Sequence, residues 1–212
     1  MAWSWRDEGR NQQINKFQHI RPVLRQGDRN MCTPLAEEAS RLDLGADLKT
    51  AMRRLAGSVS IVTSRDEEGQ PHGMAASAVM PVSIDPPSML VAVNRSAGLH
   101  AVLQHSGRYC INLLADDQHA LLEPFSQSTL RAQRFRSGPW RDAWSERASP
   151  LPWLEGASAV IACIVDQAVD YGSHTLFIGR VTDVRVDPAP VELHPPLVWL
   201  AGHRARLDLH SS

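Results

Sequence analysis

The chain has 212 residues, of which 43% are hydrophobic, and a formal net charge of −1. This length suits one compact domain with a core of its own. A nearly neutral chain has no broad attraction for nucleic acid or anionic membranes. No apolar run approaches the length of a membrane span, and the polar amino terminus lacks the apolar stretch of a secretory signal. We therefore expect a cytoplasmic protein without nucleic-acid or membrane partners.

The cysteines Cys32, Cys110 and Cys163 show no CxxC spacing. Cys110 and Cys163 lie within apolar runs typical of strands, so we expect buried free thiols. A zinc site or a disulfide framework is disfavoured, and the histidines lack metal-ligand spacing. We predict no metal site.

Residues 1–45 show little periodicity and are interpreted as an N-terminal extension, followed by one domain over residues 46–212. Met31 opens a second plausible translation start, which mass spectrometry of the native protein would test. After the extension, Leu48, Met52 and Leu55 recur at spacings of four and three, which predicts a helix with one apolar face. Asp47 is its expected N-cap and Gly57 its expected end.

Short β-branched runs then predict several adjacent strands. A hairpin is expected over residues 58–79, with a charged loop at 65–69, and the segment 81–87 is expected to be a turn because it contains Asp-Pro-Pro. Further elements follow in chain order: a strand at 88–94, a helix at 99–107, a strand at 109–114 and a helix at 116–125.

Residues 124–157 are irregular and carry Trp140, Trp144 and Trp153. The Trp-rich segment 136–153 has two interpretations, a lid that stacks on a nucleotide ring or a dimer-contact loop, and we favour the second. A long hairpin is expected over 158–186 with its turn at Gly172–His174, then a final strand and tail at 197–207. Because strands and helices do not alternate regularly, an antiparallel barrel with peripheral helices is favoured over a doubly wound sheet.

Several familiar motifs are absent. The chain has no GxGxxG after a strand, no P-loop, no HExxH and no G-x-S-x-G. These absences argue against a Rossmann nucleotide site, a P-loop nucleotide site, a zinc protease and an α/β-hydrolase.

A distributed pattern remains, in residues 73–118 (GMAASAVMPVSIDPPSMLVAVNRSAGLHAVLQHSGRYCINLLADDQ) and 172–181 (GSHTLFIGRV). It resembles the flavin reductase family, the FMN-binding split-barrel group that supplies reduced flavin to two-component monooxygenases. The resemblance covers about residues 48–207. It implies a mainly β fold, a split β-barrel of Greek-key type with peripheral α-helices. It also implies a homodimer with flavin bound near the interface.

Small side chains dominate one predicted strand. A flat isoalloxazine ring needs close approach to backbone amides, which bulky side chains would block. Small residues can also simply let two strands or subunits pack closely, and the sequence alone favours that alternative. The resemblance favours the flavin role, although Ala76 and Ala78 offer no side-chain hydrogen bonds, which leaves the choice between FMN and FAD open. The residues assigned to the ring are Met74, Ala75, Ala76, Ser77 and Ala78.

The segment that ends the next strand is assigned to the flavin phosphate: Asn94, Arg95, Ser96 and Ala97. Backbone amides at a helix start, with a serine and an arginine, form an anion site. The alternative is a plain N-cap by Ser96, at even odds. Gly98 stands where members of the family often have a polar or basic residue. Ser83 is a weaker candidate for the ribityl chain.

Two basic residues complete the predicted site. His174 lies at a hairpin tip, in a pattern that the family shows near the nicotinamide, and we assign it an orienting or electrostatic role. A histidine in a turn is more often simply solvated. Arg204 is a candidate for a flavin or nucleotide phosphate, with a solvated basic tail as the equal alternative.

The resemblance implies an enzyme in which NADH or NADPH delivers hydride to N5 of FMN or FAD. A partner monooxygenase would then use the reduced flavin on a small, aromatic substrate. Two alternatives stay open. One is an FMN-dependent reductase of another acceptor, such as a corrinoid or a metal complex, and the other is a flavin-binding module without turnover.

Overall fold

The computed structural model describes residues 44–142 and 150–208. The proposed start at Met31, Cys32, Trp144 and nearly all of the predicted extension lie outside these residues. Apart from Leu44, the described residues belong to one compact unit, Gly45–Ser212. None of the helices described in it is long and apolar enough to cross a membrane.

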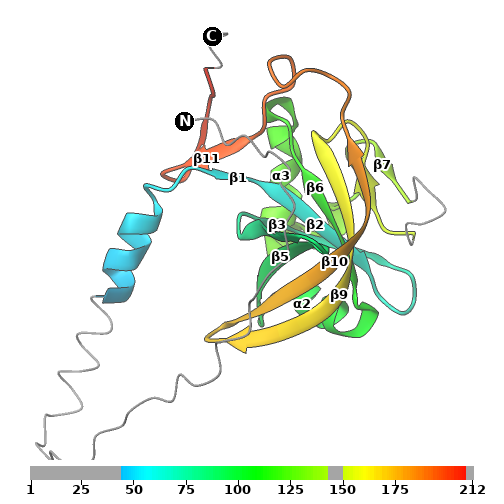
Figure 1. Cartoon of the computed structure of the whole chain (residues 1–212). Helices are drawn as coiled ribbons and strands as arrows, with labels where there is room; N and C mark the ends of the chain where they lie inside the picture. The colour runs from blue at the N-terminus through cyan, green and yellow to red at the C-terminus, as the bar shows by residue number, and fades with distance from the viewer. Residues whose placement is uncertain (1–43, 143–149, 209–212) are drawn as a thin grey trace, which may run out of the picture. The chain divides into compact units, whose positions relative to one another are not determined.

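Strands make up more of the described structure than helices do (Figure 1). A helix over residues 44–52 comes first. The other helices are α2 (Gly98–Ser106), η1 (Asp116–Leu121), α3 (Leu122–Ser126) and η2 (Ser128–Gln133). The strands are β1 (Gly57–Ser58), β2 (Ser60–Arg65), β3 (Pro71–Ala76), β4 (Val79–Ile84), β5 (Pro87–Asn94), β6 (Arg108–Leu113), β7 (Trp140–Arg141), β8 (Trp153–Leu154), β9 (Ala159–Tyr171), β10 (His174–Val186), β11 (Val198–Leu200) and β12 (His203–Ala205).

Seven of the strands form one antiparallel sheet in the order β3-β2-β6-β9-β10-β5-β4. Its two edges, β3 and β4, are consecutive in the chain and are separated by Ser77 and Ala78 alone. The sheet therefore curls until its edges meet, and the Ala92 amide donates to the Ala78 carbonyl at 3.0 Å beside this junction. We call the junction at Ser77 and Ala78 the split. The fold is mainly β and of the expected split-barrel type.

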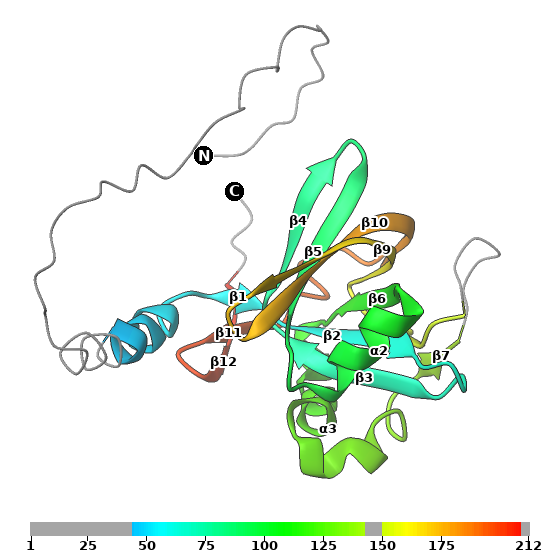
Figure 2. The same ribbon diagram turned by 90° about the horizontal axis from the view of Figure 1, so that it is seen from below.

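Helices cover both faces of β3 (Figure 2). On one face, α2 contributes Leu99 and Val102 to a core that also receives Met74 and Ala76. On the other face, Leu122 and Phe125 of α3 belong to a second core, against which Ala75 packs. The alternation of side chains along the strand produces this division. Residues 74–76 therefore pack on both faces of the strand, while the outer edge of β3 has no strand partner among the described residues.

The long hairpin β9–β10 is confirmed, with its turn at Gly172 and Ser173. Cys110 and Cys163 are buried free thiols, as expected. Burial raises the pKa of the Cys163 thiol to about 12 and that of Cys110 further still. Both are neutral packing groups at physiological pH.

The predicted turn at 81–87 is wrong in part, because β4 runs to Ile84 and the turn begins at Asp85. The pairing of β4 with β5 continues to Ile84 and Pro87, with a register shift between Pro81 and Ser83 that is typical of a β-bulge. Pro81 is compatible with a strand here because β4 lies at an edge, where a missing amide proton is tolerated.

Two helix predictions need correction. The first helix already includes residue 44, so Asp47 lies inside it and is not its N-cap. Leu44 and Ala46 are good helix formers and extend it toward the amino terminus. The predicted helix at 116–125 consists of η1 followed by α3, a 3₁₀ turn that leads into one short α-helix.

The two tryptophans that the structure describes in the Trp-rich segment pack within the domain. Trp153 is 4% exposed and belongs to the core. The Trp140 ring lies 5.3 Å from that of Phe125 and 5.0 Å from that of Phe135, and its indole N–H donates to the Ser137 carbonyl. These two residues therefore support neither a lid nor a dimer-contact loop.

Candidate functional site

The small-residue strand lies at the split. Met74, Ala75 and Ala76 end β3, and Ser77 and Ala78 connect it to β4. Because β3 is an edge strand, its outer backbone groups are not used by the sheet. A planar ligand could therefore form hydrogen bonds with this backbone, provided that no bulky side chain stands in front of it.

Two adjoining cavities flank this strand, with volumes of about 390 and 630 Å³. Both are bordered by Ser77 and Trp199, so they meet at the split. These volumes are within the range of small-molecule sites. The smaller cavity is lined by Val59, Ala75, Ala76, Ser77, His119, Leu122, Glu123, Ser126 and Trp199. The larger one is lined by Lys49, Met52, Arg53, Leu55, Ala56, Gly57, Ser77, Ala78, Trp199, Ala201 and Gly202.

The predicted phosphate turn lies beside the split. The backbone bond between Ala92 and Ala78 is followed, two residues along β5, by Asn94. The Asn94 side-chain oxygen accepts from both the amide and the hydroxyl of Ser96, at 2.9 and 2.8 Å. Ser96 therefore does not cap α2, whose N-cap residue, Ala97, has no side-chain bond. The structure brings the small-residue strand and the turn together.

The hairpin tip joins the same region. His174 pairs with Asn94 across β5 and β10. The His174 Nδ1 atom lies 2.9 Å from the Ser173 hydroxyl, and the Arg95 amide donates to the Ser173 carbonyl at 3.0 Å. The Arg95 guanidinium donates to the Gly172 carbonyl. Arg95 thus fastens the turn to the tip that carries His174.

A chain of polar contacts lies next to this tip. His100 of α2 is 8% exposed, and its Nε2 lies 2.7 Å from the hydroxyl of Thr175, which is also buried. Thr175 donates to the exposed Asp170 at 2.5 Å, and Asp170 lies 3.9 Å from the Arg95 guanidinium. The contacts link Thr175, the residue after His174, to α2 and to Arg95 of the turn.

Two predicted residues are not brought to this group. Ser83 lies at the end of the β4–β5 hairpin that is remote from the split, where its hydroxyl donates to the Asp85 carbonyl. The Arg204 guanidinium makes a two-point ion pair with Asp116, and this hydrogen bonding lowers the pKa of the Asp116 carboxyl. Arg204 therefore ties β12 to η1, and this role disfavours the predicted phosphate contact.

Trp199, His119 and Glu123 line the cavities at the split, although sequence reasoning did not single them out. Trp199 pairs with Gly57 between β11 and β1, so its place depends on a contact between the two ends of the domain. His119 and Glu123 lie on η1 and α3, opposite the strand. No local motif marks these three residues.

The site residues fit a planar aromatic ring with an anionic tail. The strand at the split offers backbone groups and the small side chains of Ala75 and Ala76, and a turn with a bonded serine and asparagine lies beside it. The described residues contain no group of three or more His, Cys, Asp or Glu side chains suited to a metal ion.

Comparison with known proteins agrees with this geometry. Residues 52–208 match the model of the flavin reductase like domain. The reductase component of an FADH(2)-dependent resorcinol hydroxylase from a Rhizobium species is 36% identical over 144 residues, which are 68% of this chain and 78% of that protein. The NADH:riboflavin 5'-phosphate oxidoreductase of Streptomyces pristinaespiralis is 32% identical over 178 residues, 83% of this chain and 93% of that protein.

Solved structures give the same result. The styrene monooxygenase flavin reductase of Pseudomonas putida S12 is 32% identical, with a TM-score of 0.64, over 77% of this chain and 99% of that one. Both the sequence match and the shared fold span most of the described domain. The chain belongs to the flavin reductase like domain family.

Proposed function

We propose that this chain is an NAD(P)H:flavin oxidoreductase that binds FMN or FAD at the split. The observation that carries the proposal is the position of the small-residue edge strand. It borders two adjoining cavities, and its end at Ala78 lies beside the turn at Asn94–Ala97. When bound, the flavin supplies the redox chemistry by accepting hydride from NADH or NADPH. The protein supplies position, exclusion of water and electrostatics.

Each part of the site has a role in this proposal. The backbone of residues 74–78 holds the edge of the ring, and the two alanines at 76 and 78 leave room for it. The turn formed by Asn94, Arg95, Ser96 and Ala97, at the start of α2, receives the phosphate. His174 orients the nicotinamide, and its position is held by Ser173 and by the chain of polar contacts next to the tip. Hydride transfer needs no protein acid or base, so we assign no proton transfer to His174.

We also propose that reduced flavin passes to a partner monooxygenase. The relatives that support this are reductase components: one serves a resorcinol hydroxylase, one a styrene monooxygenase and one a bacterial tryptophan halogenase. In a system of this kind the reductase releases reduced flavin and the partner reacts it with oxygen. The proposed cytoplasmic location is supported by the free thiols of Cys110 and Cys163, which suit a reducing compartment.

A homodimer is the proposed assembly. Met80, Val82 and Ile84 of the edge strand β4 are 55, 50 and 75% exposed. An apolar edge strand left in water is an aggregation hazard, so a second copy is a suitable cover. Replacing Val82 with Glu should shift the mass measured by light scattering from dimer to monomer. A monomeric wild-type protein would contradict this assembly.

The activity test follows absorbance of the nicotinamide band in air, with NADH or NADPH and substoichiometric FMN. A reductase oxidises many equivalents of nucleotide, because reduced flavin is reoxidised by oxygen. Loss of one equivalent or none indicates a binding module. Substituting FAD or a corrinoid for FMN separates a flavin reductase from a reductase of another acceptor.

A variant pair tests the site itself. Ser77 is exposed and borders both cavities, so Ser77→Trp should fill their junction and abolish most flavin binding. Ser128→Trp is the matched control, since Ser128 is exposed on η2 and lines neither cavity. If the two variants bind flavin equally well, the ring does not lie at the split.

A further inference from the structure

Arg131 of η2 reaches the beginning of α2. Its Nη1 atom lies 3.6 Å from the point that a Cβ of Gly98 would occupy. Gly98 directly follows the turn at Asn94–Ala97 and has no side chain of its own. The guanidinium therefore lies where a basic side chain at position 98 would otherwise extend.

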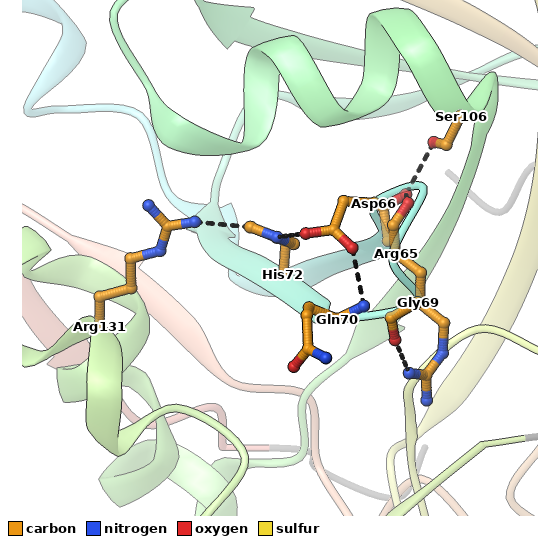
Figure 3. A network of polar contacts seen from close by, with 8 residues as sticks. Arg65, Asp66, Gly69, Gln70, His72, Ser106 and Arg131 are labelled. Carbon is orange, nitrogen blue, oxygen red and sulfur yellow. Dashed lines mark hydrogen bonds and ion pairs between the residues drawn. The ribbon is translucent and has the colours of Figure 1, made fainter.

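A bonded pair holds this guanidinium in place (Figure 3). The Arg131 Nη2 donates to His72 Nδ1 at 2.9 Å, and His72 Nε2 lies 2.7 Å from the Asp66 carboxylate. Because arginine can only donate, His72 accepts at Nδ1 and carries its proton on Nε2. The other Asp66 oxygen accepts from the Gln70 amide at 2.7 Å, which fixes the carboxylate within the β2–β3 loop.

The contact with His72 uses one of the five N–H groups of Arg131. None of the ion pairs among the described residues includes Arg131. The neighbouring Arg95 is already bonded to the hairpin tip. A cation close to the amino end of a helix opposes the helix dipole, so this position does not stabilise α2. An anion bound between Arg131 and the turn would reverse that effect.

We propose that Arg131 determines the specificity for phosphorylated flavins, by binding the 5'-phosphate with its forked N–H groups, and that Asp66 and His72 are its positioning residues. This inference rests on the proposed flavin site at the split. A planar guanidinium matches two phosphate oxygens at once, which a single serine hydroxyl cannot do. Riboflavin, which has the same ring and no phosphate, gains nothing from Arg131.

The test measures binding of FMN and of riboflavin by quenching of flavin fluorescence, without nucleotide. The wild-type protein should prefer FMN. Arg131→Ala should weaken FMN binding by about 10- to 100-fold, the range for bonds to a charged group, and leave riboflavin binding unchanged. Arg131→Lys should be intermediate, because it keeps the charge and loses the fork. Arg136→Ala is the matched control, an exposed arginine close by with the same loss of charge.

The positioning role is tested by His72→Phe, which keeps a ring and removes both hydrogen bonds. It should reduce the preference for FMN over riboflavin by about 3- to 10-fold, and it should have no further effect in the Arg131→Ala background. A general structural defect would instead weaken both flavins. If Arg131→Ala keeps the wild-type preference for FMN, the inference is wrong and the flavin site stands. If the wild-type protein binds neither flavin, the proposed function itself fails.

Discussion

Gly73 lies at the point where β3 meets α3, and its replacement by alanine tests how tightly the site strand is packed. An added Cβ would stand 2.8 Å from Phe125 Cε1, 3.1 Å from Phe125 Cδ1 and 3.2 Å from the Val62 carbonyl oxygen. The Phe125 ring cannot simply turn away, because the rings of Phe135 and Trp140 lie 5.2 and 5.3 Å from it. The strand or α3 must therefore move.

The expected loss in the free energy of unfolding is about 1–3 kcal/mol, typical of an overpacked core. At roughly 2–4 °C per kcal/mol for a chain of this size, the melting temperature should fall by about 2–12 °C. Flavin binding should weaken as well, because Leu122, Glu123 and Ser126 of this helical segment line the smaller cavity. Thermal unfolding followed by circular dichroism and flavin titration measure the two effects.

Gly57→Ala is the control, since nothing lies within 4 Å of its added Cβ. A second check uses Phe125→Leu, which makes room for the new methyl group. The double variant Gly73→Ala/Phe125→Leu should be more stable than the sum of the two single effects predicts. Melting temperatures of Gly73→Ala and Gly57→Ala that agree within about 1 °C would refute the packing argument, because the predicted loss is larger.

Three further predictions concern the barrel, the carboxyl-terminal strands and the hairpin tip. Gly179→Ala places a Cβ 2.5 Å from the hydroxyl of the fully buried Tyr109, which donates to the Met89 carbonyl. The free energy of unfolding should therefore fall by about 2–4 kcal/mol, as measured by urea unfolding. An unchanged midpoint would contradict this prediction. The bond from Arg204 lowers the pKa of Asp116 in the folded state. The stability that this ion pair contributes is therefore present above the unfolded-state pKa, near 4, and is lost as the pH falls through the folded-state pKa. Asp116→Asn should therefore lower the melting temperature at pH 7, and the difference from wild type should shrink toward pH 3; a constant difference would argue against the ion pair. His174→Ala should slow nucleotide oxidation while the melting temperature is unchanged. If the steady-state kinetics of this variant match those of the wild-type protein with both NADH and NADPH, His174 does not belong to the site.

Local sequence patterns were sufficient for most of the fold. The β-branched runs predicted β2, β5, β6, β9 and β10, and the glycine after α2 predicted its end, because each signal lies within a few residues. The strand β4 was missed because Pro81 and the Asp-Pro-Pro run at 85–87 favour a turn. Its position at an edge of the sheet allows Pro81 to lie within a strand. That position is a property of the whole sheet and is not visible in a local window.

The same distinction applies to the site. Asn94, Ser96 and the small residues at the split were predicted as site residues because each forms part of a short, contiguous pattern. The ion pair of Arg204 was not predicted, because its partner, Asp116, lies 88 residues away and no local pattern near either residue indicates the pairing. The positions of Arg131 and Trp199 were not predicted for the same reason, since each contacts residues of a distant element.

Two prolines, Pro71 in β3 and Pro81 in β4, flank the unpaired backbone at the split. Edge strands attract further strands, and proline prevents this by removing a backbone donor. Pro71 opens β3 and Pro81 lies within β4, so both edges carry a proline, and residues 72–80 between them carry none. In this interval every residue retains its amide, and the side chains at 75–78 are small. The edge is thus protected at both ends and open in the middle, which is the condition that a flat ligand bound through backbone hydrogen bonds requires.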